Sequence, residues 1–216
     1  PTFTVAVEPY RDPMPLDVLT AALIALGAAG TGLVAIYAFR PLHRLFHNIG
    51  HPWLMVTTGG VVLGLLGALG GRITLFRGVD QMRELTSDAS DYTIAGFALV
   101  IVVKLAALVV SATCGFPGGR IFPAVFLGVA IGLLVNDAFP AVPASLCVSA
   151  GVLGTVLAVS RDGWVSLFLA VVVVGEVSLT PILLLATLPA WLLLTGKPQM
   201  VLGSEPEPDA STRTEG

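Results

Sequence analysis

Long apolar segments, separated by short polar ones, dominate this chain. Four of them carry no charged residue, namely residues 18–39, 53–71, 138–160 and 177–196. Each approaches the roughly 20 residues that an α-helix needs to cross about 30 Å of hydrocarbon. A single segment of this kind could be a buried helix of a soluble protein, but several in succession favour the lipid bilayer as solvent. We therefore predict an all-α, multi-pass protein of the cell membrane.

Proline, glycine and charge mark the expected ends of the helices. We expect a long helix over 15–48, broken or bent near Pro41, and a second over 52–71, followed by a polar stretch. Beyond that stretch we expect helices over 92–113, 119–136, 143–159, 163–177 and 180–195. Several are short or interrupted by proline, which is tolerated at membrane depth where the backbone lines a cavity or is buried in protein. Broken helices of this kind are typical of transporters and channels.

Composition agrees with a membrane protein and divides the chain into three parts. Charged residues make up 12% of the 216 residues, whereas about a quarter is usual in soluble domains. We expect residues 1–14 to form a loop that enters a membrane region over 15–203, and they lack the pattern of a signal peptide. Residues 204–216, rich in proline, acid and Ser/Thr, should form a disordered polar tail. The basic cluster at 40–51 places the end of the first helix in the cytoplasm.

Histidine and cysteine supply the candidates for a metal site. His43 and His47 are four residues apart, as helical metal ligands can be, but Arg44 stands where zinc proteases carry a glutamate. An intramembrane enzyme built on these histidines would contain metal. Basic residues at the membrane interface explain them better, so we expect no enzyme, metal, cofactor or nucleic-acid partner. Cys114 and Cys147 lack CxxC spacing and should be small buried residues.

Small residues and isolated charges in the apolar segments call for separate explanations. Gly60 and Gly64, Gly67 and Gly71, and Gly128 and Gly132 each stand four residues apart, a spacing that lets helix backbones approach closely. Lys104 lies in the middle of an apolar run, so it is either a functional charge or a structural contact. Glu176 is expected near a membrane interface. Arg161 and Asp162, directly before Gly163, should mark a turn.

The stretch CGFPGGRIFP, residues 114–123, combines the features of an anion site. Gly118 and Gly119 have no side chain to keep an ion from the backbone, and Pro123 fits the first turn of a helix, where a missing N–H costs nothing. A helix that starts there directs its first N–H groups and about half a positive charge at whatever lies in front of it. Between two membrane helices, these features are typical of a selectivity element.

Three stretches resemble the carboxy-terminal half of the CLC family of chloride channels and chloride/proton antiporters. SATCGFPGGRIFPAVFLGVAIG is similar to the family's glycine-rich GxFxP filter motif and the helix that follows it. The segment from RPLHRLFH through HPWLMVTTGGVVLGLLGALGG is similar in order and spacing to the family's long tilted helix and its successor. TGKPQMVLG resembles the GKP segment that opens the last helix. The likeness covers roughly residues 15–203.

The resemblance implies a fold of two inverted repeats with broken and tilted helices, of which this chain is the second half and needs the amino-terminal half. It implies a homodimer whose surface includes the helices over 163–195. It also implies an anion-facing element and a path, with the N–H groups of Arg120 and Ile121 toward the anion and Met200 on the cytoplasmic side. Lys104, because it lies in an apolar run, is a candidate supporting charge beside this path. The residues of the anion-facing element are Gly118, Gly119, Arg120, Ile121 and Phe122.

These implications favour an anion channel or transporter, with chloride as the expected ion. The chain differs from the family's pattern in having Ile121 in place of the filter phenylalanine and Met200 in place of a tyrosine that donates a hydroxyl. The alternative is a CLC-like membrane protein that binds or senses an anion without conducting it. Arg120 is the residue that favours this alternative, because conduction requires sites that release the ion.

Overall fold

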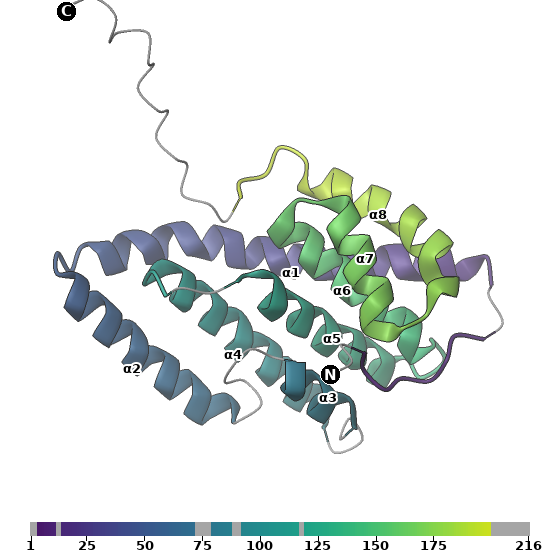
Figure 1. Ribbon diagram of the computed structural model, residues 1–216, viewed down its shortest axis with the longest axis horizontal. Coiled ribbons are helices and arrows are strands. Elements are labelled where there is room, and N and C mark those ends of the chain that lie inside the picture. Colours follow the sequence, from purple (N-terminus) through teal and green to yellow (C-terminus); the bar gives the residue numbers. More distant parts are fainter. Residues whose placement is uncertain (1–3, 12–13, 72–78, 88–91, 117–118, 200–216) are drawn as a thin grey trace, which may run out of the picture.

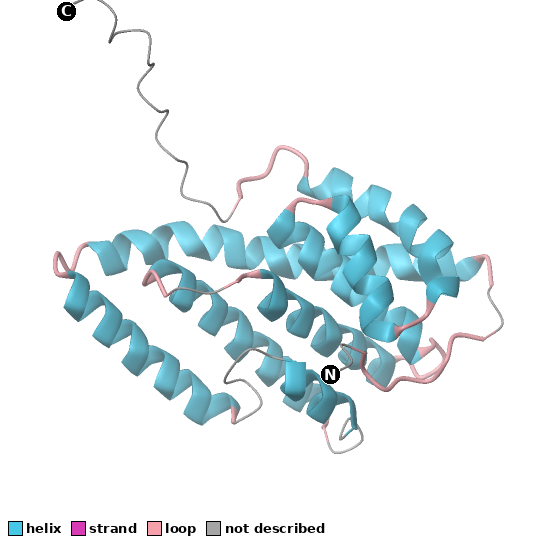
Figure 2. Ribbon diagram, viewed as in Figure 1, coloured by secondary structure: helices cyan, strands magenta, loops and turns pink. Residues whose placement is uncertain are grey.

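The computed structural model describes residues 4–11, 14–71, 79–87, 92–116 and 119–199 of the chain. Throughout these residues the regular structure is helical (Figures 1 and 2). The expected tail over 204–216 lies outside the described residues. The helices are α1 (Leu16–His47), α2 (Pro52–Gly70), α3 (Val79–Ser87), α4 (Ile94–Thr113), α5 (Ile121–Ala138), α6 (Ala144–Ser160), α7 (Gly163–Val174), the short 3₁₀-helix η3 (Val177–Leu179) and α8 (Thr180–Leu194).

The helices expected from the apolar segments are confirmed, with three differences. The first helix is not broken near Pro41, because α1 continues through it to His47; membrane helices tolerate proline where other groups satisfy the freed backbone. Helix α7 ends at Val174, earlier than expected, because Gly175 adopts a left-handed conformation with φ 76°. Helix α3 was not expected, and it buries Met82 and Leu85 where it packs against α5.

Among the described residues, five stretches are long and apolar enough to cross a membrane: α1, α2, α4, α5 and the continuous stretch Val177–Leu194. Helices α6 and α7 are apolar but shorter. In an aqueous protein this amount of apolar helix surface would have to be buried, yet Trp53 of α2 is 86% exposed and Leu192 of α8 is 72% exposed. The chain is therefore a multi-pass membrane protein.

Helix α6 forms the centre of the bundle, since every residue from Ser145 to Ala158 is buried. It lies against α5, α1, α7 and α8 (Figure 1). Glycine makes the closest of these contacts, because a Cβ at Gly128 or Gly132 would lie 2.4 Å from the Cα of Val152 or Val148. The expected close approach is thus confirmed for Gly128 and Gly132. It brings α5, which begins with the candidate anion site, against the most buried helix.

The glycines of α2 behave differently. A Cβ built at Gly60 or Gly64 would have no atom of the described chain within 4 Å, so the close helix contact expected there is not formed in this chain. Gly59 is the exception, because its Cβ would lie 2.5 Å from the Sγ of Cys114. Gly59 therefore allows α2 to lie close to the end of α4, where the chain turns toward α5, and apolar side chains of α2 pack there as well.

Candidate functional site

Helix α5 begins within the glycine-rich stretch, as the sequence predicts. Arg120 is its N-cap, and Ile121 and Phe122 start the first turn. The Ala124 N–H donates the first hydrogen bond of the helix to the Arg120 carbonyl, at 3.2 Å. Pro123 is the third residue of the helix, where an N–H has no partner within the helix. The start of α5 therefore carries the partial positive charge of a helix N-terminus.

The two ends of α5 reach the surface of the described chain, and its middle does not. Ile121 is 38% exposed and Phe122 is 46% exposed, whereas every residue from Ala124 to Leu133 is buried. Gly119 is exposed, and a Cβ built on it would meet nothing within 4 Å. The helix thus presents its positive end to the outside between apolar side chains, while its middle, from Ala124 to Leu133, is fixed in the core. Gly118 lies outside the described residues.

The end of α4 holds the approach to this site in place. Gly115 follows the C-cap residue Cys114 with φ 73°, and the Phe116 N–H donates to the Ser111 carbonyl at 3.2 Å. This is the long hydrogen bond of a Schellman motif, which stops a helix and turns the chain sharply. Cys114 is buried with Phe46 and Val110 in a small apolar cluster. The chain therefore leaves α4 in a fixed direction before it reaches α5.

Lys104 is buried within the bundle and lies against the helix that carries the site. Its side chain is 4% exposed, and its Nζ lies 4.8 Å from the ring centroid of Phe126, the sixth residue of α5. A cation over an aromatic face is attracted by the ring's quadrupole, more strongly when water is excluded. The geometry thus places a positive charge near the amino end of α5 and away from lipid.

The remaining candidates are Met200, the histidines, Glu176 and the cysteines. Met200 lies outside the described residues. The rings of His43 and His47 are tilted by 39° with their centroids 3.8 Å apart, and among the described residues no group of three metal-ligating side chains gathers. Glu176 lies between α7 and η3, where its carboxylate accepts a hydrogen bond from Ser178 at 3.3 Å. Cys114 and Cys147 are confirmed as buried, free cysteines.

The turn predicted at Arg161 and Asp162 is confirmed, and it contains a contact that was not predicted. Asp162 caps α7 by accepting hydrogen bonds from the N–H groups of Trp164 and Val165 at 2.9 and 3.0 Å. The Arg161 side chain reaches across to the carbonyls of Leu194 and Pro198. No sequence spacing indicates such a contact, because its acceptors are backbone carbonyls more than 30 residues away.

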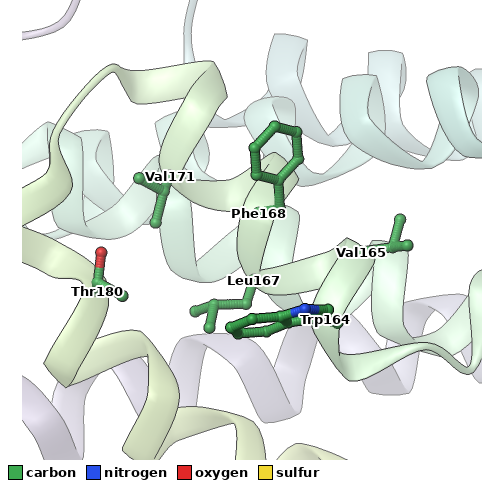
Figure 3. Close-up of a pocket in the computed structure, with 6 residues that line it drawn as sticks. All are labelled: Trp164, Val165, Leu167, Phe168, Val171 and Thr180. Atoms are coloured by element: carbon green, nitrogen blue, oxygen red, sulfur yellow. The ribbon is translucent and has the colours of Figure 1, made fainter.

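An apolar groove of about 430 Å³ lies on the outer side of α7. Figure 3 shows its six lining side chains, five of them from α7 and one, Thr180, from the start of α8. Trp164 is 78% exposed and Phe168 is 64% exposed. This surface lies within the segment 163–195, for which the sequence predicts a subunit contact.

A family model described as "Voltage gated chloride channel" matches residues 2–194. The chain belongs to the voltage-gated chloride channel family. Relatives from three Escherichia coli strains, SMS-3-5, IAI39 and K12 DH10B, are each named "Putative ion-transport protein YfeO". Each is 46% identical over 202 residues, which are 94% of this chain and 48% of the relative. The chain therefore spans about half the length of the curated relatives it matches.

The family assignment confirms the resemblance drawn from the filter-like stretch and the order of the helices. It also agrees with the all-α, multi-pass architecture that the structure shows.

Proposed function

We propose that this chain is the carboxy-terminal half of an anion channel or transporter of the cell membrane, with chloride as its ion. The observation that carries the proposal is the accessible first turn of α5, at the positive end of a helix whose next ten residues, Ala124 to Leu133, are buried. Family membership supports transport rather than catalysis, and the proposed action includes no covalent step and no cofactor.

The geometry suits an anion that must be held and then released. Backbone N–H groups and the helix dipole attract an anion without a titrating partner. The apolar side chains of Ile121 and Phe122 keep water away and add no charge, and the glycines Gly118 and Gly119 leave the backbone open to the ion. Lys104, buried against α5, would add a positive charge nearby when it is protonated. Met200 would complete the path on its cytoplasmic side.

Two partners follow from the same proposal. The anion path needs an amino-terminal half of the same fold, which agrees with a chain that matches about half of each relative. The groove between α7 and the start of α8 would close against a second copy in a homodimer, because its exposed aromatic side chains form an apolar surface.

A charge placed at the first turn of α5 tests the proposed site. In the full-length protein, Ile121→Glu would put a carboxylate at the helix N-terminus, where it competes with the anion. We expect chloride flux into liposomes to fall about tenfold at neutral pH and to recover as the carboxylate is protonated, near pH 4. Ile121→Gln, of equal size and without charge, is the control and should show no such recovery. Equal flux in the two variants at neutral pH would contradict the site.

A second function is favoured by one residue, the N-cap Arg120. A permanent positive charge beside a helix N-terminus could hold an anion too firmly for conduction, which would make the protein an anion-binding or sensing protein. Arg120→Leu separates the two functions. Under the transport proposal, we expect chloride flux to increase about tenfold or less while anion binding persists. Loss of anion binding in a variant without flux would favour the sensing protein.

A further inference from the structure

Arg161 has a backbone conformation that is costly for a side chain of its size. It caps the carboxyl end of α6 with φ 57° and ψ 24°, and its N–H donates to the Leu157 carbonyl. Among the described residues it is the only one other than glycine with a positive φ. Glycine would adopt this conformation without strain. A strained arginine at this position suggests that its side chain has a task of its own.

That task is visible in the hydrogen bonds of the guanidinium. One terminal nitrogen, Nη1, donates to the carbonyl of Leu194, the last residue of α8. The other, Nη2, donates to the carbonyl of Pro198 at 2.8 Å. The planar fork of an arginine can satisfy two acceptors at once, which a lysine cannot do with the same geometry. Arg161 therefore joins the end of α6 to both the end of α8 and the segment beyond it.

The position of this contact suits a structural charge. The carbonyls in the last turn of a helix lack partners within the helix, and a cation near them is favourable. Leu194 is buried, and its carbonyl also accepts from the Lys197 N–H at 3.2 Å. Asp162, the neighbouring acid, is already engaged with the first turn of α7. The arginine is thus directed at backbone carbonyls and does not form an ion pair with its neighbour.

The segment so held connects α8 to the last part of the chain. Gly196, with φ 72°, and Pro198 are part of the TGKP stretch. The resemblance of this stretch to the family's GKP segment implies that Met200, two residues after Pro198, lies along the anion path. We propose that Arg161 is a positioning residue, which fixes the segment Thr195–Gln199. It thereby fixes the wall of the path that is formed by the residues after α8. The consequence for flux rests on the proposed function, whereas the anchoring of the segment does not.

Two measurements on the full-length protein test the proposal. Hydrogen–deuterium exchange reports whether the amides of Thr195–Gln199 are held, and chloride and nitrate flux into liposomes report whether the path depends on them. The variants are Arg161→Gln and, in case that variant does not fold, Arg161→Lys, which keeps the charge and loses the fork. Arg40→Gln, which removes an exposed arginine from α1, is the matched control.

We expect Arg161→Gln to raise the exchange rate of these amides about tenfold while the amides of α5 stay protected. We also expect chloride flux to fall about tenfold and the chloride-to-nitrate ratio to change, with partial recovery in Arg161→Lys. Unchanged exchange in both variants would overturn the anchoring. If the amides of Thr195–Gln199 exchange faster but chloride flux and the chloride-to-nitrate ratio match the wild type, the proposed effect of Arg161 on the anion path is wrong. If the unaltered protein passes no anion, the proposed function fails, and the exchange data still decide the anchoring.

Discussion

At the scale of single residues, Tyr10 ties the segment before α1 to that helix. Its hydroxyl donates to the Asp17 carboxylate at 2.5 Å, and the Met14 N–H donates to the same oxygen at 2.9 Å. Tyr10 is only 8% exposed. Burial, and then the hydrogen bond to Asp17, raise the pKa of Tyr10 to about 12. The fold therefore favours the neutral phenol, which donates this bond.

This pKa predicts a loss of stability at alkaline pH. Because the folded pKa of about 12 exceeds the ordinary value of 10.0, the stabilisation is complete below pH 10 and disappears as the pH rises toward 12. Between about pH 9 and about pH 11.5 we expect the wild type to lose about 1–2 kcal/mol more than Tyr10→Phe, measured by thermal unfolding of the purified protein. Equal losses in the two proteins would show that the phenol does not titrate in this way.

Residue-level features were predictable from the sequence where neighbouring residues in the chain determine the local structure. The turn at Arg161 and Asp162 and the place of Pro123 in the first turn of α5 both follow from local geometry. The aromatic partner of Lys104 and the two carbonyls that Arg161 contacts could not be predicted. Those contacts depend on how distant helices pack, and a backbone carbonyl leaves no signal in a sequence.

At the scale of helices, glycine decides how closely α5 and α6 approach. Gly128→Ala would place a methyl group 2.4 Å from the Cα of Val152, which is backbone and cannot turn aside. We expect a loss of about 1–3 kcal/mol in the free energy of unfolding, because the two helices must separate. Displacing α5 should also disturb the anion site at its amino end.

Gly64→Ala on α2 is the matched control for this change. Its new methyl group meets no atom of the described chain within 4 Å, and alanine favours a helix over glycine by up to about 1 kcal/mol. Unfolding of both variants in the same detergent should therefore shift in opposite directions. A loss for Gly64→Ala as large as that for Gly128→Ala would show that close packing does not distinguish the two positions.

The helices themselves were predictable because apolar length alone identifies a membrane helix. Their ends were less so: the left-handed Gly175 stops α7 early, and Pro41 does not interrupt α1. Helix α3 was missed because its sequence is largely polar: from Gln81 to Ser87, Met82 and Leu85 are the buried residues. Which glycines pack closely was also not readable, since Gly60–Gly64 and Gly128–Gly132 share one spacing and differ in their surroundings.

At the scale of the whole molecule, the exposed aromatic side chains of α7 predict a contact between two copies. The double variant Trp164→Ala/Phe168→Ala would remove the two largest side chains of the groove. We expect the dimer to dissociate at least about tenfold more readily in detergent, measured by sedimentation, because each buried aromatic contributes over 1 kcal/mol. Leu19→Ala/Leu23→Ala, which removes two exposed apolar side chains from α1, should leave the dimer unchanged. Equal sedimentation of all three proteins would contradict a contact at α7.

The proposed anion path requires residues from both halves of the fold, and this chain supplies one half. The order of the helices along the chain and the filter-like stretch at 114–123 were sufficient to predict the family, because both can be read from contiguous sequence. The partner surfaces follow less directly. The first turn of α5 and the outward side of α2 are exposed here, and the chain covers 48% of the relatives it matches. We infer that the other half of the fold closes the path.

Chloride release from liposomes is the experiment on which the proposed function depends. The full-length protein is purified as a folded dimer, reconstituted into liposomes loaded with chloride, and examined for chloride release after the membrane potential is relieved. We predict chloride release well above that of chloride-loaded liposomes without protein, and a fall in release in the Ile121→Glu variant. Intact dimers that pass neither chloride nor another small anion would contradict the account.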